Sequence, residues 1–475
     1  MAGIFKVLML CLGFVLFSES VFASGEVLAE EELAYATRSV TGGVNVAALL
    51  RGLFGLIVLL VIAVFLSKDR KNINWRLVGA GLLLQVVVAL GVLYIPAVES
   101  FFVVLGKVFV KIMDFSKAGA SFLFGDLANS RKFGHIFIFQ VLPALVFFSA
   151  LTSLLYYLRV IQTLVTGVAW CLKKLFGISG AEGLTVSGSV FLGLIEAPLL
   201  VKRYLPTMNR SELFLIMSSG MATVAGGVMA AYIGMLGGDN PAARLQFAKY
   251  LISASVMAAP AVIAVAKIIV PQTETVADCL VADEDNGGKK NLLESIVGGA
   301  FEGIKVAVSV GALLLVFVAM VAMVNYLLGG LIGEYSGLNK IISQWTDGRY
   351  TELNFQLVLG FLFMPVSWIM GVCNQDLLTV GGLLGTKLVL NEFVAYADLT
   401  ALKNAGVFFQ EKSIVISTYL LCGFANIGSI GMLIGGLGAL VPSRRGQIVE
   451  YGFLSMVCGA LVSCMSATIM GAIIG

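Results

Sequence analysis

Long apolar segments, separated by short polar loops, set the strongest limit on what this chain can fold into. Hydrophobic residues occupy 59% of its 475 positions and charged residues only 12%. Such a chain must turn most of its folded surface to lipid instead of water. Because a helix of roughly 20 residues crosses a bilayer, the length allows about eight to ten spans. The sequence therefore predicts an all-α polytopic membrane protein whose main environment is the lipid bilayer.

Clusters of Lys and Arg predict which loops face the cytoplasm, since basic loops are retained on that side. Residues 68–76 and 443–446 are basic and are expected inside, which places both ends of the mature chain in the periplasm. At the N-terminus, Lys6 precedes a short apolar run that ends in Val21-Phe-Ala23, the pattern of a signal peptide. Residues 1–23 are therefore expected to be cleaved off. The alternative is an uncleaved first span, for which an apolar core of about eleven residues is short.

Two apolar regions do not look like ordinary spans. Residues 177–204 and 355–396 are interrupted by several glycines and by Pro198 and Pro365, respectively. Irregular backbone at membrane depth is tolerated only where protein or a water-filled cavity covers it. We therefore expect two re-entrant hairpins that enter the membrane from opposite faces.

Each expected hairpin carries a glutamate at its tip, Glu196 in the first and Glu392 in the second. A carboxylate inside a bilayer costs about 2.5 to 3.5 kcal/mol even on the mildest insertion scale. A chain that keeps two of them is expected to use them. These residues therefore mark the predicted substrate site.

The two hairpins belong to a repeated pattern. Each is followed by a span that small residues interrupt, at 222–227 and at 423–429, and then by an uninterrupted span. Inverted repeats with discontinuous helices are typical of secondary transporters. The predicted fold is thus about eight transmembrane helices plus two opposed re-entrant hairpins in an inverted repeat.

Other function classes find little support in the sequence. The seven cysteines are scattered singly and His135 is the only histidine, so no local metal or redox cluster is expected. The absence of a nucleotide-binding loop argues against an ATP-driven pump, and no cofactor or nucleic acid partner is expected. An intramembrane enzyme would need a nucleophile and base beside the carboxylates, and none is evident. A gated ion pore remains the alternative to a transporter.

Several motifs, in order from about residue 50 to the C-terminus, closely resemble the concentrative nucleoside transporter family. They are Phe139-Gln-Val-Leu-Pro143, Phe147-Phe-Ser-Ala-Leu151, Gly180-Ala-Glu-Gly183, Glu196-Ala-Pro-Leu-Leu200, Asn391-Glu-Phe-Val-Ala-Tyr396, Cys422-Gly-Phe-Ala-Asn-Ile-Gly-Ser-Ile-Gly431 and Gly435-Gly-Leu-Gly438. The resemblance implies a homotrimer in a bacterial inner membrane that imports nucleosides by symport with Na⁺ or H⁺. It also implies an elevator-like transport domain that slides against a scaffold.

With this resemblance the chain divides into five expected regions. They are a signal peptide (1–23), N-terminal scaffold spans (24–158), the first hairpin with one half of the transport domain (159–271), a cytoplasmic linker with a long scaffold helix (272–333), and the second hairpin with the other half of the transport domain (334–475).

The resemblance assigns Glu392, Asn426 and Ser429 to the ribose hydroxyls of the substrate and places Phe424 beside the base. A carboxylate, an amide and a hydroxyl are chemically complementary to a vicinal diol. They are also costly to bury without partners.

On the base side the sequence departs from the family pattern. Where the family has Gly-Gln-Thr-Glu, this chain has Gly193, Leu194, Ile195 and Glu196. Two hydrogen-bonding side chains are replaced by aliphatic ones, which leaves Glu196 to read the base and Val228 as an apolar wall. Since apolar pockets discriminate less than hydrogen-bonding ones, altered or relaxed base selectivity is expected, or a substrate that is not a nucleoside.

The expected coupling-ion site differs as well. Ser189 stands where the family has a Na⁺-ligating Asn, Thr223 supplies a hydroxyl, and the carbonyls of Leu192 and Val224 complete the set. These oxygens suit a hard cation. Two alternatives stay open: proton coupling through one of the intramembrane carboxylates, and a Thr223 hydroxyl that simply bonds to its own helix.

Overall fold

The computed structural model describes residues 45–129, 136–274, 291–346 and 348–474. The expected signal peptide therefore lies outside the described residues. The described part of the chain is helical, with no strand.

The N-terminal helices begin at residues that suit helix starts. The side chains of Asn45 and Asn74 accept backbone N–H groups in the first turns of α3 and α4, and Pro96 opens α5. Asn at the N-cap and Pro in the first turn both stabilise helix beginnings. The helices of this part are α3 (Val46–Phe65), α4 (Trp75–Tyr94), α5 (Pro96–Phe124), α7 (Phe137–Gln140) and α8 (Leu142–Tyr157).

A broken hairpin, a broken helix and a long continuous helix follow in that order. The hairpin is α10 and α11, the broken helix is α12 and α13, and the long helix is α14. Their bounds, with the preceding α9, are α9 (Val160–Phe176), α10 (Gly180–Ser189), α11 (Glu196–Leu199), α12 (Arg210–Ala222), α13 (Gly226–Gly237) and α14 (Pro241–Ile269).

The same order returns in the C-terminal part, which confirms the expected repeat. The bounds are α17 (Phe355–Ile369), α18 (Leu377–Val389), α19 (Glu392–Asn404), α20 (Glu411–Leu421), α21 (Ile427–Leu440) and α22 (Arg445–Ile474). The second hairpin starts later and ends later than the expected 355–396. It consists of α18 and α19, because α17 is a separate helix that packs along α18.

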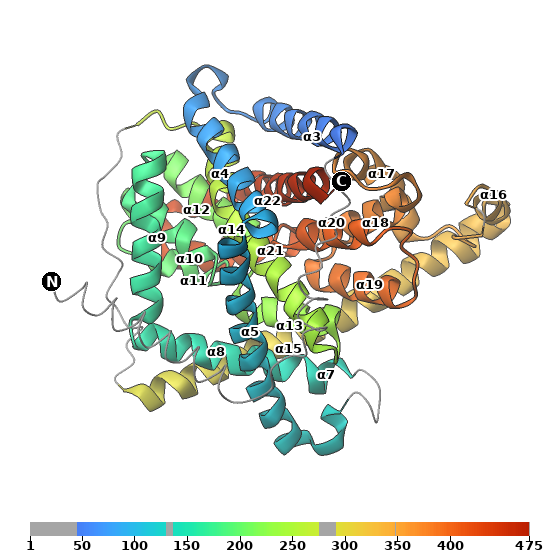
Figure 1. Ribbon diagram of the computed structural model, residues 1–475, viewed down its shortest axis with the longest axis horizontal. Coiled ribbons are helices and arrows are strands. Elements are labelled where there is room, and N and C mark those ends of the chain that lie inside the picture. Colours follow the sequence, from blue (N-terminus) through green and yellow to red (C-terminus); the bar gives the residue numbers. More distant parts are fainter. Residues whose placement is uncertain (1–44, 130–135, 275–290, 347, 475) are drawn as a thin grey trace.

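Between the repeats lies α15 (Leu292–Asn325), which continues as a π-helix (Tyr326–Gly333) to the short α16 (Leu338–Trp345). Helix α16 projects from the body of the molecule (Figure 1). Gly299 and Gly303 let α15 approach the backbone of α8 closely. The hydroxyls of Ser153 and Ser295 each donate to the other's carbonyl at 2.9 Å. Small residues and hydroxyls of this kind are what hold helices together in lipid, so α8 and α15 form a pair.

Among the described residues, seven helical segments are long and apolar enough to cross a membrane. They are Val46–Phe65, Trp75–Tyr94, Phe137–Tyr157, Arg210–Gly237, Pro241–Ile269, Leu292–Gly333 and Pro442–Ile474. Neither α20 nor α21 reaches that length alone, but together they form a broken helix that is long enough for an eighth crossing. This agrees with the predicted count.

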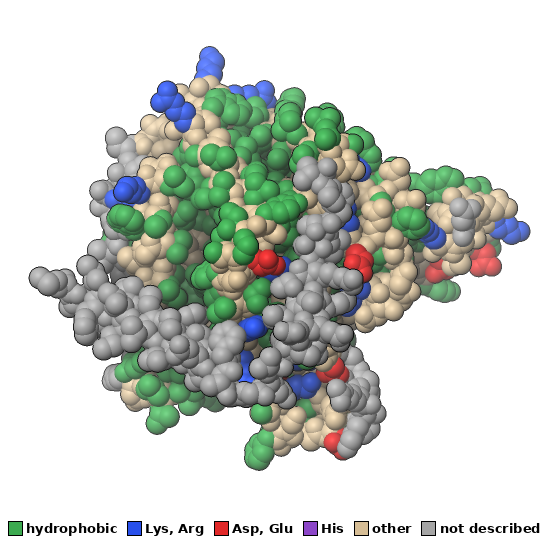
Figure 2. Space-filling model, in the orientation of Figure 1, with side chains coloured by type: hydrophobic (Ala, Val, Ile, Leu, Met, Phe, Trp, Pro, Cys, Tyr) green, Lys and Arg blue, Asp and Glu red, His purple; other side chains and the backbone are tan. Residues whose placement is uncertain are grey.

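Apolar side chains cover much of the face shown in Figure 2, and Lys and Arg gather at its upper edge, over the loop that joins α3 and α4. The core is built by the repeats: most residues in the apolar stretches of α14 and α22 are buried, whereas few in the apolar stretch of α15 are. The molecule therefore has a dense centre made of repeat elements, with the α8–α15 pair against its side.

Candidate functional site

The first hairpin is held by its own polar groups. Ser179 and Glu182 form a capping box at the start of α10, and the Oε1 of Glu182 accepts a hydrogen bond from Lys267 of α14. At the tip, the Oε2 of Glu196 accepts the backbone N–H of Gly193 at 3.0 Å. One oxygen of the Glu196 carboxylate is thus engaged in shaping the tip.

A cavity of about 310 Å³ lies where this hairpin and α13 meet the α8–α15 pair. Ligand pockets of roughly 300 to 1,000 Å³ suit small molecules. The lining is Leu145, Ser149, Thr152, Ser153, Tyr156, Phe191, Leu192, Glu196, Leu199, Lys202, Ala225, Gly226, Gly227, Val228, Glu302 and Val306. Of the residues predicted to read the base, Glu196 and Val228 therefore face this cavity.

Glu196 is exposed and lines the cavity, so this carboxylate is not sealed inside an apolar span. The reason is the break in the hairpin: Glu196 opens α11 beside the cavity. The side chain can therefore be hydrated, and the cost of a carboxylate in hydrocarbon does not apply to it.

Leu194 and Ile195 point to helices on the other side of the tip. Leu194 is buried against Gly220 of α12, and Ile195 packs on Gly436 of α21. Gly436 lies seven residues after Ser429, so the two share one face of α21. Ile195 therefore joins the tip of the first hairpin to the helix face that carries a predicted ribose ligand.

The second acidic residue, Glu392, has a different environment, with only 3% of its surface exposed. Its Oε2 accepts the side-chain amide of Asn426 at 2.7 Å, and its Oε1 accepts the hydroxyl of Tyr232 at 3.3 Å. The predicted partners Glu392 and Asn426 are thus brought together, with a tyrosine that the sequence pattern does not single out.

Asn426 also shapes the start of α21. Its Oδ1 accepts the backbone N–H of Ser429 at 2.8 Å, as an N-cap does. The hydroxyl of Ser429 is fully buried and has no hydrogen-bond partner in the described part of the chain. An unpaired buried hydroxyl costs roughly 1 to 3 kcal/mol, so this group calls for a partner.

Phe424 lies in the break that precedes α21 and is partly buried. Its backbone N–H donates to the carbonyl of Thr223 at 3.3 Å. Thr223 lies in the break between α12 and α13, so this hydrogen bond joins the broken helices of the two repeats.

Helix α13 connects the two acidic centres. Val228 lines the cavity, and Tyr232, one helical turn later, bonds Glu392. The structure therefore does not place all predicted substrate residues around one cavity: Glu196 and Val228 line it, whereas Glu392, Asn426 and Ser429 are buried behind α13. The i to i+4 spacing from Val228 is the signal in the sequence that could have pointed to Tyr232.

The predicted ion-site residues meet at the junction of the first hairpin with the α12–α13 break. The carbonyl of Phe191 accepts the N–H of Gly226 at 3.1 Å, which ties the two segments together. The Ser189 hydroxyl donates to the carbonyl of Val186, and the Thr223 hydroxyl donates to that of Ser219. The expected alternative for Thr223, a bond to its own helix, is therefore present, and both hydroxyls keep lone pairs.

Two backbone carbonyls at the same junction have no backbone donor. Leu192 and Val224 are buried, and within the described residues neither carbonyl accepts a backbone hydrogen bond. Buried carbonyls are normally paired. Oxygen ligands of this kind suit a hard cation.

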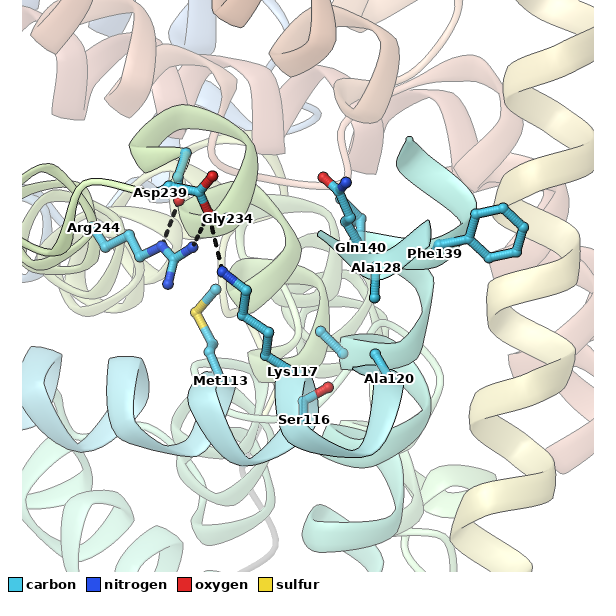
Figure 3. A pocket seen from close by; sticks show the side chains of 13 residues that line it. Met113, Ser116, Lys117, Ala120, Ala128, Phe139, Gln140, Gly234, Asp239 and Arg244 are labelled. Carbon is cyan, nitrogen blue, oxygen red and sulfur yellow. Dashed lines mark hydrogen bonds and ion pairs between the residues drawn. The ribbon is translucent and has the colours of Figure 1, made fainter. Parts of the chain in front are cut away.

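A second, smaller cavity lies at the other end of α13 (Figure 3). Its volume is about 80 Å³, too small for a drug-sized ligand. Asp239 there pairs with Lys117 at 3.0 Å and with Arg244 at 3.4 Å, and Arg244 also reaches Asp114 at 3.6 Å. The charges neutralise one another, and the cluster ties α5 to the α13–α14 turn.

Comparison with known proteins supports the class of protein that this geometry defines, a secondary transporter of the broken-helix, inverted-repeat type. Residues 54–127 and 250–471 match the N-terminal and C-terminal parts of the Na⁺ dependent nucleoside transporter family, and residues 138–239 match a region described as nucleoside recognition. The chain belongs to this family, the concentrative nucleoside transporters, which are transporters and not enzymes.

Individual relatives cover nearly the whole chain. The nucleoside permease NupC of Helicobacter pylori is 37% identical over 89% of this chain and 97% of its own length. The sodium/nucleoside cotransporter 1 of rat is 36% identical over 88% of this chain, which spans 62% of that longer protein. Among solved structures, CNTnw in an inward-facing substrate-bound state superposes with a TM-score of 0.80 at 37% identity, over 90% of this chain and 99% of that one.

Proposed function

We propose that this protein imports nucleosides by symport with a cation, and that Glu392, Asn426 and Ser429 bind the ribose. The observation that carries the proposal is the buried hydrogen-bonded pair of Glu392 and Asn426, beside a Ser429 hydroxyl that has no partner among the described residues. A ribose diol supplies both a donor for the carboxylate and a partner for the hydroxyl. NupC of Helicobacter pylori is named a nucleoside permease, which supports the same substrate class.

The base is proposed to lie toward the cavity, between Glu196 and Val228, with Phe424 at its side. Because Leu194 and Ile195 pack on glycines of α12 and α21, the tip offers apolar surface where the family pattern has two hydrogen-bonding groups. We therefore propose relaxed or altered base selectivity. A non-nucleoside solute is the alternative substrate.

Sodium is the proposed coupling ion. The support is the set of four oxygens at one junction: the hydroxyls of Ser189 and Thr223, and the carbonyls of Leu192 and Val224, which have no backbone donor among the described residues. Relatives named for sodium dependence point the same way. Proton coupling through Glu196 or the buried Glu392 is the competing proposal.

The movement is proposed to be elevator-like. The α8–α15 pair, within regions 24–158 and 272–333, would be the scaffold, and the repeats in 159–271 and 334–475 would move against it. The cavity lies along this boundary, which supports the division. The exposed apolar surface of α15 fits lipid and the neighbours of a homotrimer. A bacterial inner membrane with both mature termini in the periplasm is the proposed setting.

The test is uptake into proteoliposomes with separately imposed Na⁺ and pH gradients. Saturable accumulation of unchanged uridine or adenosine that needs Na⁺ supports the proposal in full. Accumulation that follows the pH gradient and is unaffected when choline replaces Na⁺ shows that the coupling ion is the proton and not sodium. Flux that does not accumulate solute against a gradient indicates a pore. No uptake of any nucleoside redirects the search to other solutes.

A further inference from the structure

Lys387 is a fully buried lysine near the end of α18, three residues before Leu390 at the tip of the second hairpin. Within the described residues no ion pair joins it to a carboxylate, in contrast to Lys267 of the first repeat, which pairs with the buried Glu182. A buried ammonium is costly unless hydrogen bonds compensate it. The partners in those hydrogen bonds therefore indicate the role of Lys387.

Both contacts lead to the break between α20 and α21. The Nζ of Lys387 donates to the carbonyl of Leu420 at 2.8 Å and to the hydroxyl of Ser463 on α22 at 3.0 Å. The Ser463 hydroxyl in turn donates to the carbonyl of Cys422 at 2.9 Å. Leu420 lies in the last turn of α20 and Cys422 is its C-cap. The carbonyls at such a helix end form the negative end of the helix dipole.

The corresponding junction in the first repeat has no such cation among the described residues. There the end of α10 meets the end of α12, and the hydroxyls of Ser189 and Thr223 stand beside the carbonyls of Leu192 and Val224. The two junctions have the same construction, a hairpin end against the C-terminus of a broken helix. Among the described residues, the carbonyls of Leu192 and Val224 at the first junction have no backbone donor, whereas at the second junction the ammonium of Lys387 donates to the carbonyl of Leu420.

We infer that Lys387 is a tethered cation that does in the second repeat what the transported ion does in the first. It neutralises the end of α20 and fixes the break, so that Asn426 and Ser429, four and seven residues after Cys422, are held in position for the substrate. It is a positioning residue, since it acts through the break and touches no ligand. It also restricts ion binding to one of the two junctions. The inference rests on the proposed nucleoside site and on the proposed cation site of the first junction.

The test is chemical rescue of a Lys387→Ala variant in a nucleoside-binding assay. Removal of charge-assisted hydrogen bonds should weaken nucleoside binding about ten- to hundredfold. Methylammonium, which fits the space left by the lysine end, should restore binding, whereas choline at the same ionic strength should not. Normal binding by Lys387→Ala, or equal effects of both cations, overturns the inference.

Two further variants separate charge from packing. Lys387→Met keeps the length without the charge and should bind as poorly as the alanine variant without amine rescue, whereas Lys387→Arg should keep most of the binding. A methionine variant that binds like the wild type shows that only packing matters and overturns the inference. This test also decides the question if the alanine variant does not fold. Lys267→Ala is the matched control: it breaks an ion pair outside the junction, so nucleoside binding by the folded variant should stay near the wild-type level with or without methylammonium.

A second readout separates this inference from the proposed function. Methylammonium should raise the thermal midpoint of Lys387→Ala and leave the wild type unchanged, because a ligand stabilises the state that binds it. This shift does not require any nucleoside. If the wild type binds no nucleoside, the proposed substrate fails, while the amine-dependent shift still supports or refutes the tethered cation.

Discussion

The two hairpins contain the same element, a glutamate at the first position of the returning helix, yet the two carboxylates have different surroundings. Glu196 faces a cavity and shapes its own tip by accepting the N–H of Gly193. Glu392 is buried and binds two other elements, through Tyr232 of α13 and Asn426 before α21. The two repeats thus contain similar hairpins, but the carboxylate of the first is accessible from a cavity and that of the second is buried and held by hydrogen bonds.

The largest expected effect separates these two carboxylates. Glu392→Ala removes the acceptor of Tyr232 and Asn426 and leaves both groups unpaired, so nucleoside binding should fall by about a hundredfold. Glu196→Gln, which keeps an oxygen to accept the N–H of Gly193, should change binding much less. Titration of both variants with one nucleoside measures this. Equal losses in the two variants would remove the distinction drawn between the hairpins.

The next effect concerns the place where the repeats touch. Gly423 has a φ of +139°, and a Cβ there would lie 3.0 Å from the carbonyl oxygen of Ala222. Gly423→Ala should therefore destabilise the protein by roughly 1 to 3 kcal/mol. Gly431, in α21 with open space around it, is the matched control, and Gly431→Ala should be neutral or stabilising. Thermal unfolding in detergent compares the two. A Gly423→Ala protein as stable as the control would mean that the α12–α13 and α20–α21 breaks are not in tight contact.

A smaller effect tests the apolar tip of the first hairpin. Leu194→Gln with Ile195→Thr restores the polar pattern of the family and should increase the discrimination between uridine and adenosine by about tenfold or more. Ile195→Val, which keeps the tip apolar, serves as the control and should leave the ratio unchanged. Competition uptake measures both. An unchanged ratio in the double variant would show that base selection lies elsewhere.

The smallest effect concerns the first junction. Ser189→Ala removes one of four proposed oxygen ligands and should weaken sodium activation a few-fold, since the carbonyls and Thr223 remain. Ser187 offers a close control, because its hydroxyl also bonds its own helix, to Gly183, but is not part of the junction. Sodium dependence of uptake distinguishes them. The same sodium response in both variants would show that the Ser189 hydroxyl is not a sodium ligand.

Much of the architecture can be predicted from the sequence, because clustered glycines and prolines within an apolar run disfavour a continuous helix. The breaks near Thr223 and Gly423 and the two glutamates fall where the pattern predicts them. The pattern does not separate a carboxylate on a cavity from one buried behind a helix. That difference depends on which helices pack beside each tip, and hydropathy carries no information about it.

Contacts between single side chains of distant helices also lie beyond sequence-based prediction. The sequence alone does not show what Lys387 binds, whereas in the structure it donates to the Leu420 carbonyl and the Ser463 hydroxyl. The predicted start of the second hairpin is too early for a related reason: α17 is also apolar, and only its packing along α18 shows it to be a separate helix. Contacts between residues that lie far apart in the chain produce no periodic pattern in the sequence.

The hydrogen bond from the N–H of Phe424 to the carbonyl of Thr223 connects the break of the second repeat to that of the first. In the proposed symporter, the ion would bind beside Thr223 and the nucleoside beside Phe424, at the two ends of this one backbone hydrogen bond. Thermodynamic reciprocity then applies: whatever factor the ion adds to nucleoside affinity, the nucleoside must add to ion affinity.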